Sequence, residues 1–166
     1  MASQIRIEPA TEGDVGLILE FIRQLAEFER APEQVEATEE LLRKHLFGAR
    51  PVAEVIIAYV DAADGSSEAA GFALFFHNFS TWTGRPGLYL EDLFVRPEHR
   101  ALGIGRRLLV QLAHIAKERE CGRMEWVVLD WNQPAIKFYL GLGARQMNEW
   151  LINRLDGRAI DALVQS

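Results

Sequence analysis

The sequence has little cysteine and no long apolar run. Its one cysteine, Cys121, cannot form an internal disulfide, and packing is the expected role of its side chain. No stretch approaches the roughly 18 consecutive apolar residues that a membrane-spanning helix needs, and the N-terminus lacks the apolar region of a signal peptide. These features predict a cytoplasmic protein without a membrane partner.

Positive charge is also scarce. The 18 Lys and Arg residues are outnumbered by 24 Asp and Glu residues, and the net charge of -6 argues against a nucleic-acid partner. The four histidines have no metal-ligand spacing, so no metal site is expected. A chain of 166 residues with 49% hydrophobic and 25% charged residues predicts a single domain over residues 1–166.

The apolar periodicity predicts an α/β fold. Strand patterns alternate with amphipathic helix patterns, and Asp64-Gly65 is expected to turn an antiparallel hairpin. The expected strands are 5–7, 53–60, 69–76, 88–95, 124–129 and 150–155, and the expected helices cover 11–28, 38–47, 104–118 and 132–141, with a short tail after residue 156. Together they predict a mixed, mostly antiparallel sheet of about six to seven strands with helices on both faces.

The stretch RALGIG, from Arg100 to Gly105, lies between an expected strand and an expected helix. The start of a helix exposes unpaired N–H groups at the positive end of its dipole, and glycines let an anion approach the backbone closely. The spacing is neither that of a P-loop nor G-x-G-x-x-G. Four arginines surround this turn, as a pyrophosphate and a ribose phosphate would require: Arg96, Arg100, Arg106 and Arg107.

The pattern R-x-x-G-x-G resembles the pyrophosphate loop of the GNAT superfamily of acetyl-CoA-dependent N-acetyltransferases. YLEDLFV (89–95), VLDWNQPAIKFYLGLGA (128–144) and the opening at 5–29 are similar to the diamine and thialysine acetyltransferases, so the resemblance covers nearly the whole chain. Ser80-Thr81-Trp82 and LDWNQ (129–133) resemble the thialysine branch more than the polyamine branch. The resemblance implies the GNAT fold and a short amino-acid or diamine substrate.

The resemblance also implies a set of residues for acetyl-CoA. A backbone N–H at Phe94 or Val95 would meet the thioester oxygen while the pantetheine arm pairs with that strand edge, and Asn132 would hydrogen-bond the pantetheine. The full set is Phe94, Val95, Arg100, Ala101, Leu102, Gly103, Ile104, Gly105, Arg106, Asn132, Pro134 and Ala135.

Transfer of an acetyl group to an amine requires a base, because an alkylammonium with a pKa near ~10 must first lose a proton. Glu91 and Asp92 are adjacent acids in an apolar strand, where they would point to opposite faces unless a bulge intervenes. Both could instead be core carboxylates paired with an arginine or a helix end. By resemblance, Glu91 removes the proton through a water molecule and Asp92 binds or orients the amine.

The departing sulfur needs a proton donor, and a tyrosine hydroxyl can serve without carrying charge. By resemblance, Tyr139 is this general acid. The alternative role for Tyr139 is that of a buried structural tyrosine. An acid-rich segment, which includes Glu27 and Glu29, suits a cationic substrate. The substrate residues implied are Phe28, Glu29, Glu91, Asp92, Trp82, Trp126 and Glu149. Glu29 could equally be an exposed charge at a helix end, and Trp82 could equally hold its loop in place. The segment around Glu149 is shorter than its counterpart in the thialysine branch, which makes a substrate contact of Glu149 doubtful.

Three functions are compatible with these features. The first is an N-acetyltransferase for small cationic amines, and the second is the same chemistry on a lysine or N-terminus of a protein. The third, a non-catalytic CoA-binding module, would be expected to lack Glu91 and Tyr139, which are both present. The resemblance further implies a homodimer with Trp150 and Ile152 near the contact.

Overall fold

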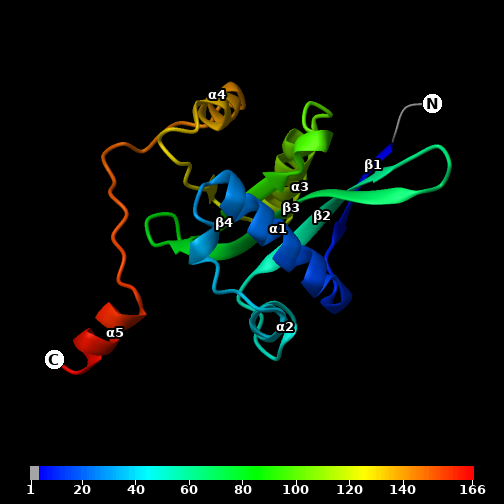
Figure 1. Ribbon diagram of the computed structural model, residues 1–166. Coiled ribbons are helices and arrows are strands. Elements are labelled where there is room, and N and C mark those ends of the chain that lie inside the picture. Colours follow the sequence, from blue (N-terminus) through cyan, green and yellow to red (C-terminus); the bar gives the residue numbers. More distant parts are fainter. Residues whose placement is uncertain (1–3) are drawn as a thin grey trace. The chain divides into compact units, whose positions relative to one another are not determined.

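The computed structural model describes residues 4–166 (Figure 1). The chain divides into a unit that ends at Val127 and a unit from Val128 to Ser166. The first unit contains β1 (Gln4–Pro9), α1 (Val15–Phe28), α2 (Glu39–Phe47), β2 (Glu54–Asp61), β3 (Ser67–Ser80), β4 (Arg85–Val95), α3 (Ile104–Glu118) and β5 (Arg123–Glu125). The second contains α4 (Gln133–Gly141) and α5 (Gly157–Val164). The expectation of a single domain stays a prediction.

The first unit is built on a mixed sheet in the order β1-β2-β3-β4-β5. β1 to β4 pair antiparallel in sequence order, and β5 joins β4 in parallel. The α/β class and the mostly antiparallel sheet are therefore confirmed. The number of strands is lower than expected, because five strands form the sheet among residues 4–166.

Helices α1 and α2 begin where the sequence places capping residues. Thr11 and Asp14 form a reciprocal capping box ahead of α1, with the Thr11 N–H 2.7 Å from the Asp14 carboxylate. The Thr38 hydroxyl accepts from the Leu41 N–H at 3.2 Å and caps α2. These side chains satisfy N–H groups that would otherwise lack partners at the first turn.

The sheet is buried on both faces (Figure 1). On one face, Ile18 and Phe21 of α1 pack against side chains of the three central strands, and the Phe21 and Phe72 rings stack at 5.2 Å. On the other face lies α3, whose Leu108 and Leu112 are fully buried and whose end places the Arg119 guanidinium 5.9 Å from the Phe75 ring. The two faces take alternate residues of each strand, as the pleat requires.

Two expected strands and the expected tail differ from the structure. The pattern at 124–129 forms a strand only over Arg123–Glu125, and residues 150–155 form none. A strand needs a hydrogen-bonded neighbour, and the described residues offer none to 150–155 despite its apolar composition. The tail contains α5, because the Asp156 carboxylate accepts from the Ala159 N–H at 2.9 Å and caps a helix that the sequence analysis missed.

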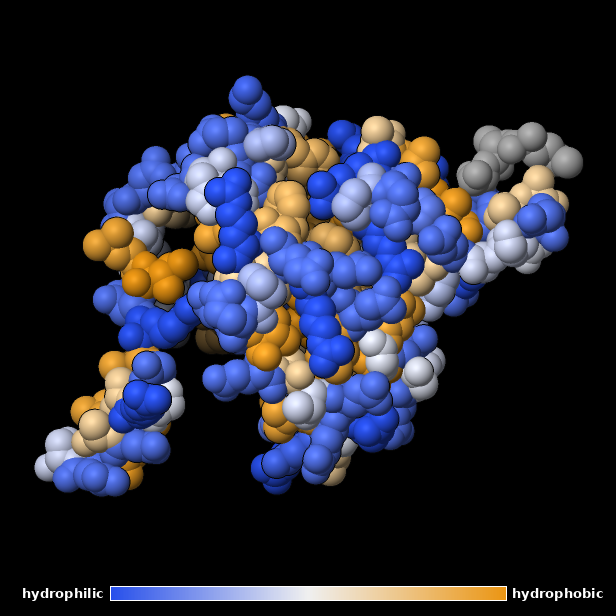
Figure 2. All heavy atoms as spheres, viewed as in Figure 1, coloured by the Kyte–Doolittle hydropathy of each residue, from blue (hydrophilic) through white to orange (hydrophobic). Residues whose placement is uncertain are grey.

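The second unit leaves its apolar side chains exposed. None of its residues is buried, and Figure 2 shows apolar atoms on the surface of α5. The exposed fractions are 66% for Trp150, 84% for Leu151, 70% for Ile152, 63% for Leu163 and 82% for Val164. Among residues 4–166, no helix is both long and apolar enough to cross a membrane.

Candidate active site

A β-bulge in β4 sets the direction of its two acidic side chains. Leu74 of β3 pairs with Asp92, but the next residue, Phe75, pairs with Leu90, so Glu91 is the extra residue. Directly opposed residues share a face of the sheet, so Asp92 lies on the α1 face with Leu74 while Leu90 lies on the α3 face with Phe75. Without the bulge, Asp92 would point into the α3 core.

Asp92 lies in an acidic and mostly dry environment. Burial raises the pKa of its carboxyl from the usual 3.8 to about 6, and the negative charges of Glu91 and Glu29 contribute to that rise. Burial also raises the pKa of Glu29, at the end of α1. The fold therefore brings three carboxylates together at the bulge. A cation would be stabilised there, and the pKa of the Asp92 carboxyl is raised toward neutral pH.

The bulge adjoins a strand edge that has no partner. The pairing of β4 with β5 ends at Tyr89 and Glu125, and among residues 4–166 nothing pairs with this edge of β4 from Leu90 to Val95. Every second residue of such an edge presents its N–H and C=O groups outward. An extended, amide-containing ligand can therefore pair there, as expected for a pantetheine arm at Phe94 and Val95.

The RALGIG turn presents backbone N–H groups at the start of α3. Gly103 is the N-cap of this helix with φ of 75°, and Ala101 also has a positive φ of 68°, which is strained for a residue with a side chain. Successive N–H groups in such a turn form a concavity that can bind an anion. Ile104 is buried and anchors the helix, while Ala101, Leu102 and Gly103 are exposed, so an anion can reach the loop.

The arginines around this turn have different surroundings. Arg96 is mostly buried, donates to Glu20 at 2.6 Å and lies over the Phe21 ring, so it holds α1 to the end of β4. The Arg100 guanidinium donates from Nε to the Val95 carbonyl at 3.1 Å and lies 4.8 Å from the Phe28 ring. Arg106 and Arg107 are exposed in the first turn of α3, next to the loop. Of the four arginines expected to bind phosphate, Arg106 and Arg107 are therefore the best placed.

The acetyltransferase (GNAT) family matches residues 19–144, which is more than half of the chain. The chain belongs to the GNAT acetyltransferase family. It is therefore an acetyltransferase, and the fold inferred from its resemblance is confirmed.

Relatives extend this likeness over the whole chain. The thialysine N-epsilon-acetyltransferase of Sus scrofa is 40% identical over 98% of both chains. An L-ornithine N5-acetyltransferase of Arabidopsis thaliana is 34% identical and covers 98% of this chain and 88% of its own. Among solved structures, an integron cassette protein from V. cholerae has a TM-score of 0.79 at 26% identity and covers 98% of both chains. The resemblance to the thialysine branch is thus confirmed.

Within the GNAT fold, the other residues expected at the acceptor amine are only partly brought together. Phe28 precedes Glu29 at the end of α1, and Trp126 directly follows β5, where the pairing of β4 and β5 stops. Trp82 is 90% exposed at the tip of the β3–β4 hairpin. The tip is separated from Glu91 by six residues of β4, about 20 Å of strand, so it does not adjoin the carboxylates.

The remaining expected residues lie in the second unit. Tyr139 is half-buried in α4, and burial raises the pKa of its hydroxyl above the usual 10.0. Asn132 is the N-cap of α4, with its Oδ1 accepting from the Ala135 N–H at 3.3 Å, and Pro134 occupies the first turn. Glu149 is exposed. The Asn132 cap thus fixes the first turn of α4, while Tyr139 lies near the C-terminal end of the helix.

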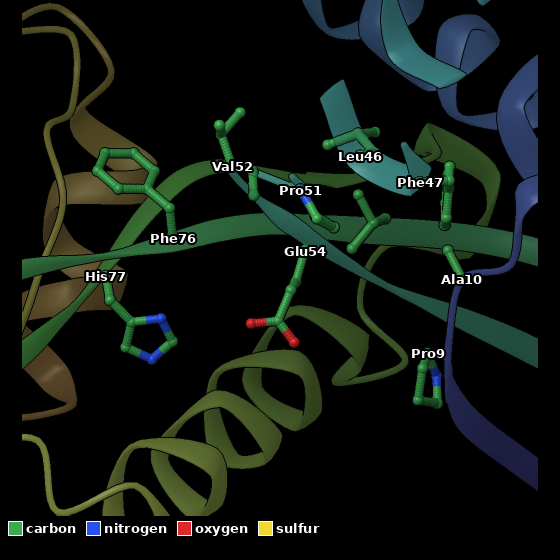
Figure 3. A pocket seen from close by; sticks show the side chains of 11 residues that line it. Pro9, Ala10, Leu46, Phe47, Pro51, Val52, Glu54, Phe76 and His77 are labelled. Carbon is green, nitrogen blue, oxygen red and sulfur yellow. The ribbon is translucent and has the colours of Figure 1, made fainter. Parts of the chain in front are cut away.

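A separate hollow of about 590 Å³ lies where α2 meets the ends of β1 and β2 (Figure 3). Leu46, Phe47 and Val52 line its apolar side. Its acid, Glu54, is paired with Arg119 at 2.9 Å, and this hydrogen bond lowers the pKa of the Glu54 carboxyl. None of the residues expected at the active site lines it.

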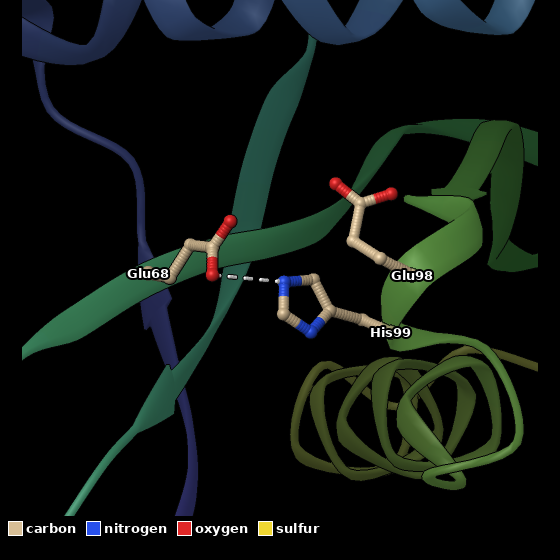
Figure 4. Close-up of side chains that lie close together, drawn as sticks. All are labelled: Glu68, Glu98 and His99. Atoms are coloured by element: carbon tan, nitrogen blue, oxygen red, sulfur yellow. Dashed lines mark ion pairs between the residues drawn. The ribbon is translucent and has the colours of Figure 1, made fainter.

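One histidine lies in an ion-pair network that the sequence did not predict. The His99 Nε2 is 3.3 Å from Glu68, and Glu98 lies nearby, so the three could approach one metal ion (Figure 4). Arg96 already faces Glu68 at 3.8 Å and neutralises part of its charge. The network ties the turn after β4 to the start of β3. Spacing in the sequence could not indicate it, because β3 pairing brings Glu68 to this place.

Proposed function

We propose that the protein transfers the acetyl group of acetyl-CoA to the primary amine of a small cationic substrate. The observation that carries the proposal is the group of three carboxylates at the β4 bulge, Glu29, Glu91 and Asp92. An ammonium group is attracted there by opposite charge and can lose its proton to a carboxylate. Relatives that act on thialysine and ornithine, both of which carry a terminal amine, support this substrate class.

Acetyl-CoA supplies the acetyl thioester in this proposal. The exposed loop N–H groups from Ala101 to Gly105 would bind its pyrophosphate, together with Arg106, and Leu102 and Ile104 shape that loop. The unpaired β4 edge at Phe94 and Val95 would hold the pantetheine. Asn132, Pro134 and Ala135 at the start of α4 would contribute further contacts from the second unit.

Two residues would move protons. Glu91, the bulge residue, is exposed and can accept the amine proton through a water molecule, while Asp92 orients the ammonium. Tyr139 would donate its hydroxyl proton to the departing sulfur, and the hydroxyl carries this proton at neutral pH. No metal takes part in the proposal.

We also propose a homodimer in the cytoplasm. The exposed apolar side chains of the second unit, which include Trp150 and Ile152, form a surface that water contacts unfavourably and that a second copy could cover. Light scattering at micromolar concentration should give twice the mass of one chain. A monomer would rule out this part of the proposal.

The activity is tested by release of the CoA thiol with thialysine, ornithine, putrescine, spermidine and a lysine-containing peptide. Turnover should be highest with the small amines, and a preference for the peptide would favour a protein substrate instead. Glu91→Gln separates the base from a merely structural residue. Its rate should fall most at low pH and partly recover at high pH, where the solvent has already removed the amine proton. A loss that is independent of pH would remove Glu91 from the base role.

A further inference from the structure

A histidine and two glutamates converge where the turn after β4 lies against the start of β3 (Figure 4). Glu98 and His99 belong to a single 3-10 turn, Pro97–His99, and Glu68 lies at the start of β3. Each side chain offers one ligand atom, and these three atoms lie within 4.8 Å of one another. The cluster thus joins two parts of the chain that are far apart in sequence.

The His99 ring is the least exposed member of this cluster. Its side chain is 13% exposed, whereas that of Glu68 is 58% exposed. The His99 Nε2 is buried and forms no hydrogen bond with any of residues 4–166, although the Glu68 carboxylate is 3.3 Å away. A buried polar atom without a hydrogen bond is unfavourable. A ligand that binds this nitrogen and the carboxylate together would remove that cost.

The charges around the cluster favour a divalent cation as that ligand. Glu68 faces Arg96 through Oε1 and His99 through Oε2, so the oxygen next to the ring is not the one that faces the guanidinium. Arg96 has Glu20 as a closer partner at 2.6 Å, and among residues 4–166 no cationic side chain pairs with Glu98 through its carboxylate. The three carboxylates and the one guanidinium leave a net charge of −2 when the ring is neutral, as metal binding requires.

The ligand types favour zinc among the common divalent ions. A ring nitrogen together with carboxylate oxygens suits zinc, whereas magnesium and calcium prefer oxygen ligands alone. Tetrahedral zinc with bonds of about 2.0–2.1 Å holds its ligand atoms about 3.3 Å apart, which matches the separation of the His99 Nε2 and the Glu68 carboxylate. Glu98 is exposed, so a change of its rotamer can bring its carboxylate closer.

We propose that Glu68, Glu98 and His99 bind one zinc ion, with water in the fourth position. The backbone already holds the two elements together. The Arg96 N–H donates to the Ala70 carbonyl at 2.9 Å, and the His99 N–H donates to the Arg96 carbonyl at 3.0 Å. Zinc would add a link through side chains to this backbone link.

The ion has a structural role and no part in acetyl transfer. Leu74, which pairs with Asp92, is six residues of β3 from Glu68, about 20 Å of strand. Because the three ligands are held together only in the folded chain, the free energy of zinc binding stabilises the fold. The part of the fold that gains most is the turn that leads into RALGIG.

Zinc binding is measured on the full chain after a chelator has been removed by dialysis. Calorimetry with zinc chloride should give one ion per chain. Zinc at about 100 times its Kd should raise the Tm by roughly 5–10 °C, while magnesium and calcium at the same concentration should change it little. No zinc binding, or an equal rise with magnesium, would overturn the proposal.

Variants then locate the ion. Glu68→Gln, Glu98→Gln and His99→Gln should each weaken zinc binding by about 10-fold or more. His114→Gln, at an exposed histidine of α3, and Cys121→Ser, at the one thiol, are the matched controls and should bind zinc like the unmodified protein. Unmodified affinity in the three ligand variants, or a loss in either control as large as theirs, would overturn the proposal.

A folding control keeps the test decisive. His99 is mostly buried, so the melting of each variant is first recorded in the presence of chelator. Glu98→Gln changes an exposed side chain and should melt like the unmodified protein under these conditions. If this folded variant still bound zinc with unmodified affinity, the three-ligand site would be ruled out. None of these measurements depends on turnover, so their outcome is independent of the proposed acetyltransferase substrate.

Discussion

The two units of the chain are stabilised by different interactions. The first unit has a core on both faces of its sheet, with Phe21, Phe72 and Leu108 fully buried. The second unit has two well-capped helices but no buried residue. Capping and helix propensity therefore stabilise helices in both units, whereas fully buried apolar side chains stabilise only the first unit.

This difference matters because the proposed chemistry draws on both units. Glu91 and Asp92 are on a strand fixed by pairing and packing, while Tyr139 is on a helix of nine residues. Isolated helices shorter than about 12 to 15 residues are marginal in water, so α4 and α5 need apolar contacts to persist. We expect the first unit to bind the acceptor and the pyrophosphate of acetyl-CoA, and Tyr139 of the second unit to control turnover.

The largest expected effect is that of Gly103→Asp in the first unit. Acetyl-CoA binding should be abolished, because the left-handed φ of 75° disfavours a side chain and a carboxylate would repel the pyrophosphate. Gly84→Asp is the matched control, since Gly84 has a φ of 65° and nothing within 4 Å of an added Cβ. Calorimetry that gave both variants the same CoA affinity would contradict the loop assignment.

Tyr139→Phe tests the contribution of the second unit. The ring and its contact with Phe138 at 5.4 Å survive, so acetyl-CoA affinity should be kept, whereas kcat should fall by roughly 10²- to 10⁴-fold. Tyr59→Phe, in the first unit, is the control and should leave kcat unchanged. Steady-state kinetics that gave unmodified turnover for Tyr139→Phe would remove the acid role.

A pair of apolar truncations compares the packing of the two units. Leu108→Ala should lower the free energy of unfolding by about 2–5 kcal/mol, because this fully buried side chain leaves a cavity in the α3 core. Ile160→Ala, at a side chain that is 50% exposed, should change it by less than about 0.5 kcal/mol. Urea titration measures both. A large loss for Ile160→Ala would mean that this side chain is covered, which would contradict its exposure.

The smallest expected effect concerns the pH dependence of stability. Because the pKa of Asp92 is raised to about 6 in the folded state, folding becomes less favourable as pH rises from about 4 to 6, where only the unfolded state has lost the proton. Asp92→Asn should therefore be more stable at pH 7 by on the order of 2 kcal/mol, and similar at pH 4. Urea titrations at these two pH values measure the difference.

Asp61→Asn is the control with the opposite sign. The hydrogen bond from Arg6 lowers the pKa of the Asp61 carboxyl, so its contribution to stability is present at neutral pH and is lost as pH falls. The variant should be less stable at pH 7 than the unmodified protein, and similar at low pH. If Asp92→Asn had the same pH dependence as Asp61→Asn, Asp92 would not be a buried acid without a cationic partner.

Local features were predictable because their cause is local. The helix starts at Thr38 and Asn132 follow from short-range capping, and the β2–β3 hairpin follows from Asp64-Gly65 between apolar runs. The RALGIG turn and the family also follow from contiguous residues. Helix α5 was not predicted, although Asp156 is a capping residue, because Asp156-Gly157 is also typical of a turn into a tail.

Features that depend on distant residues were not predictable. Residues 150–155 have the composition of a strand, but a strand exists only where a neighbour accepts its hydrogen bonds. The bulge at Glu91 was recognised only as a possibility, since register is a property of the β3–β4 pair. The contact of the Arg100 guanidinium with the Phe28 ring likewise depends on α1 lying against the turn after β4.

The sequence by itself therefore determined the acetyltransferase family, the anion-binding turn and the identities of the acidic residues. Tertiary structure decided which face Asp92 occupies, how far burial and neighbouring charges raise its pKa, and that Arg100 lies over Phe28. The physical reason is that desolvation and Coulomb interactions depend on distances between residues that are far apart in the chain, whereas capping and turn geometry depend on a few consecutive residues.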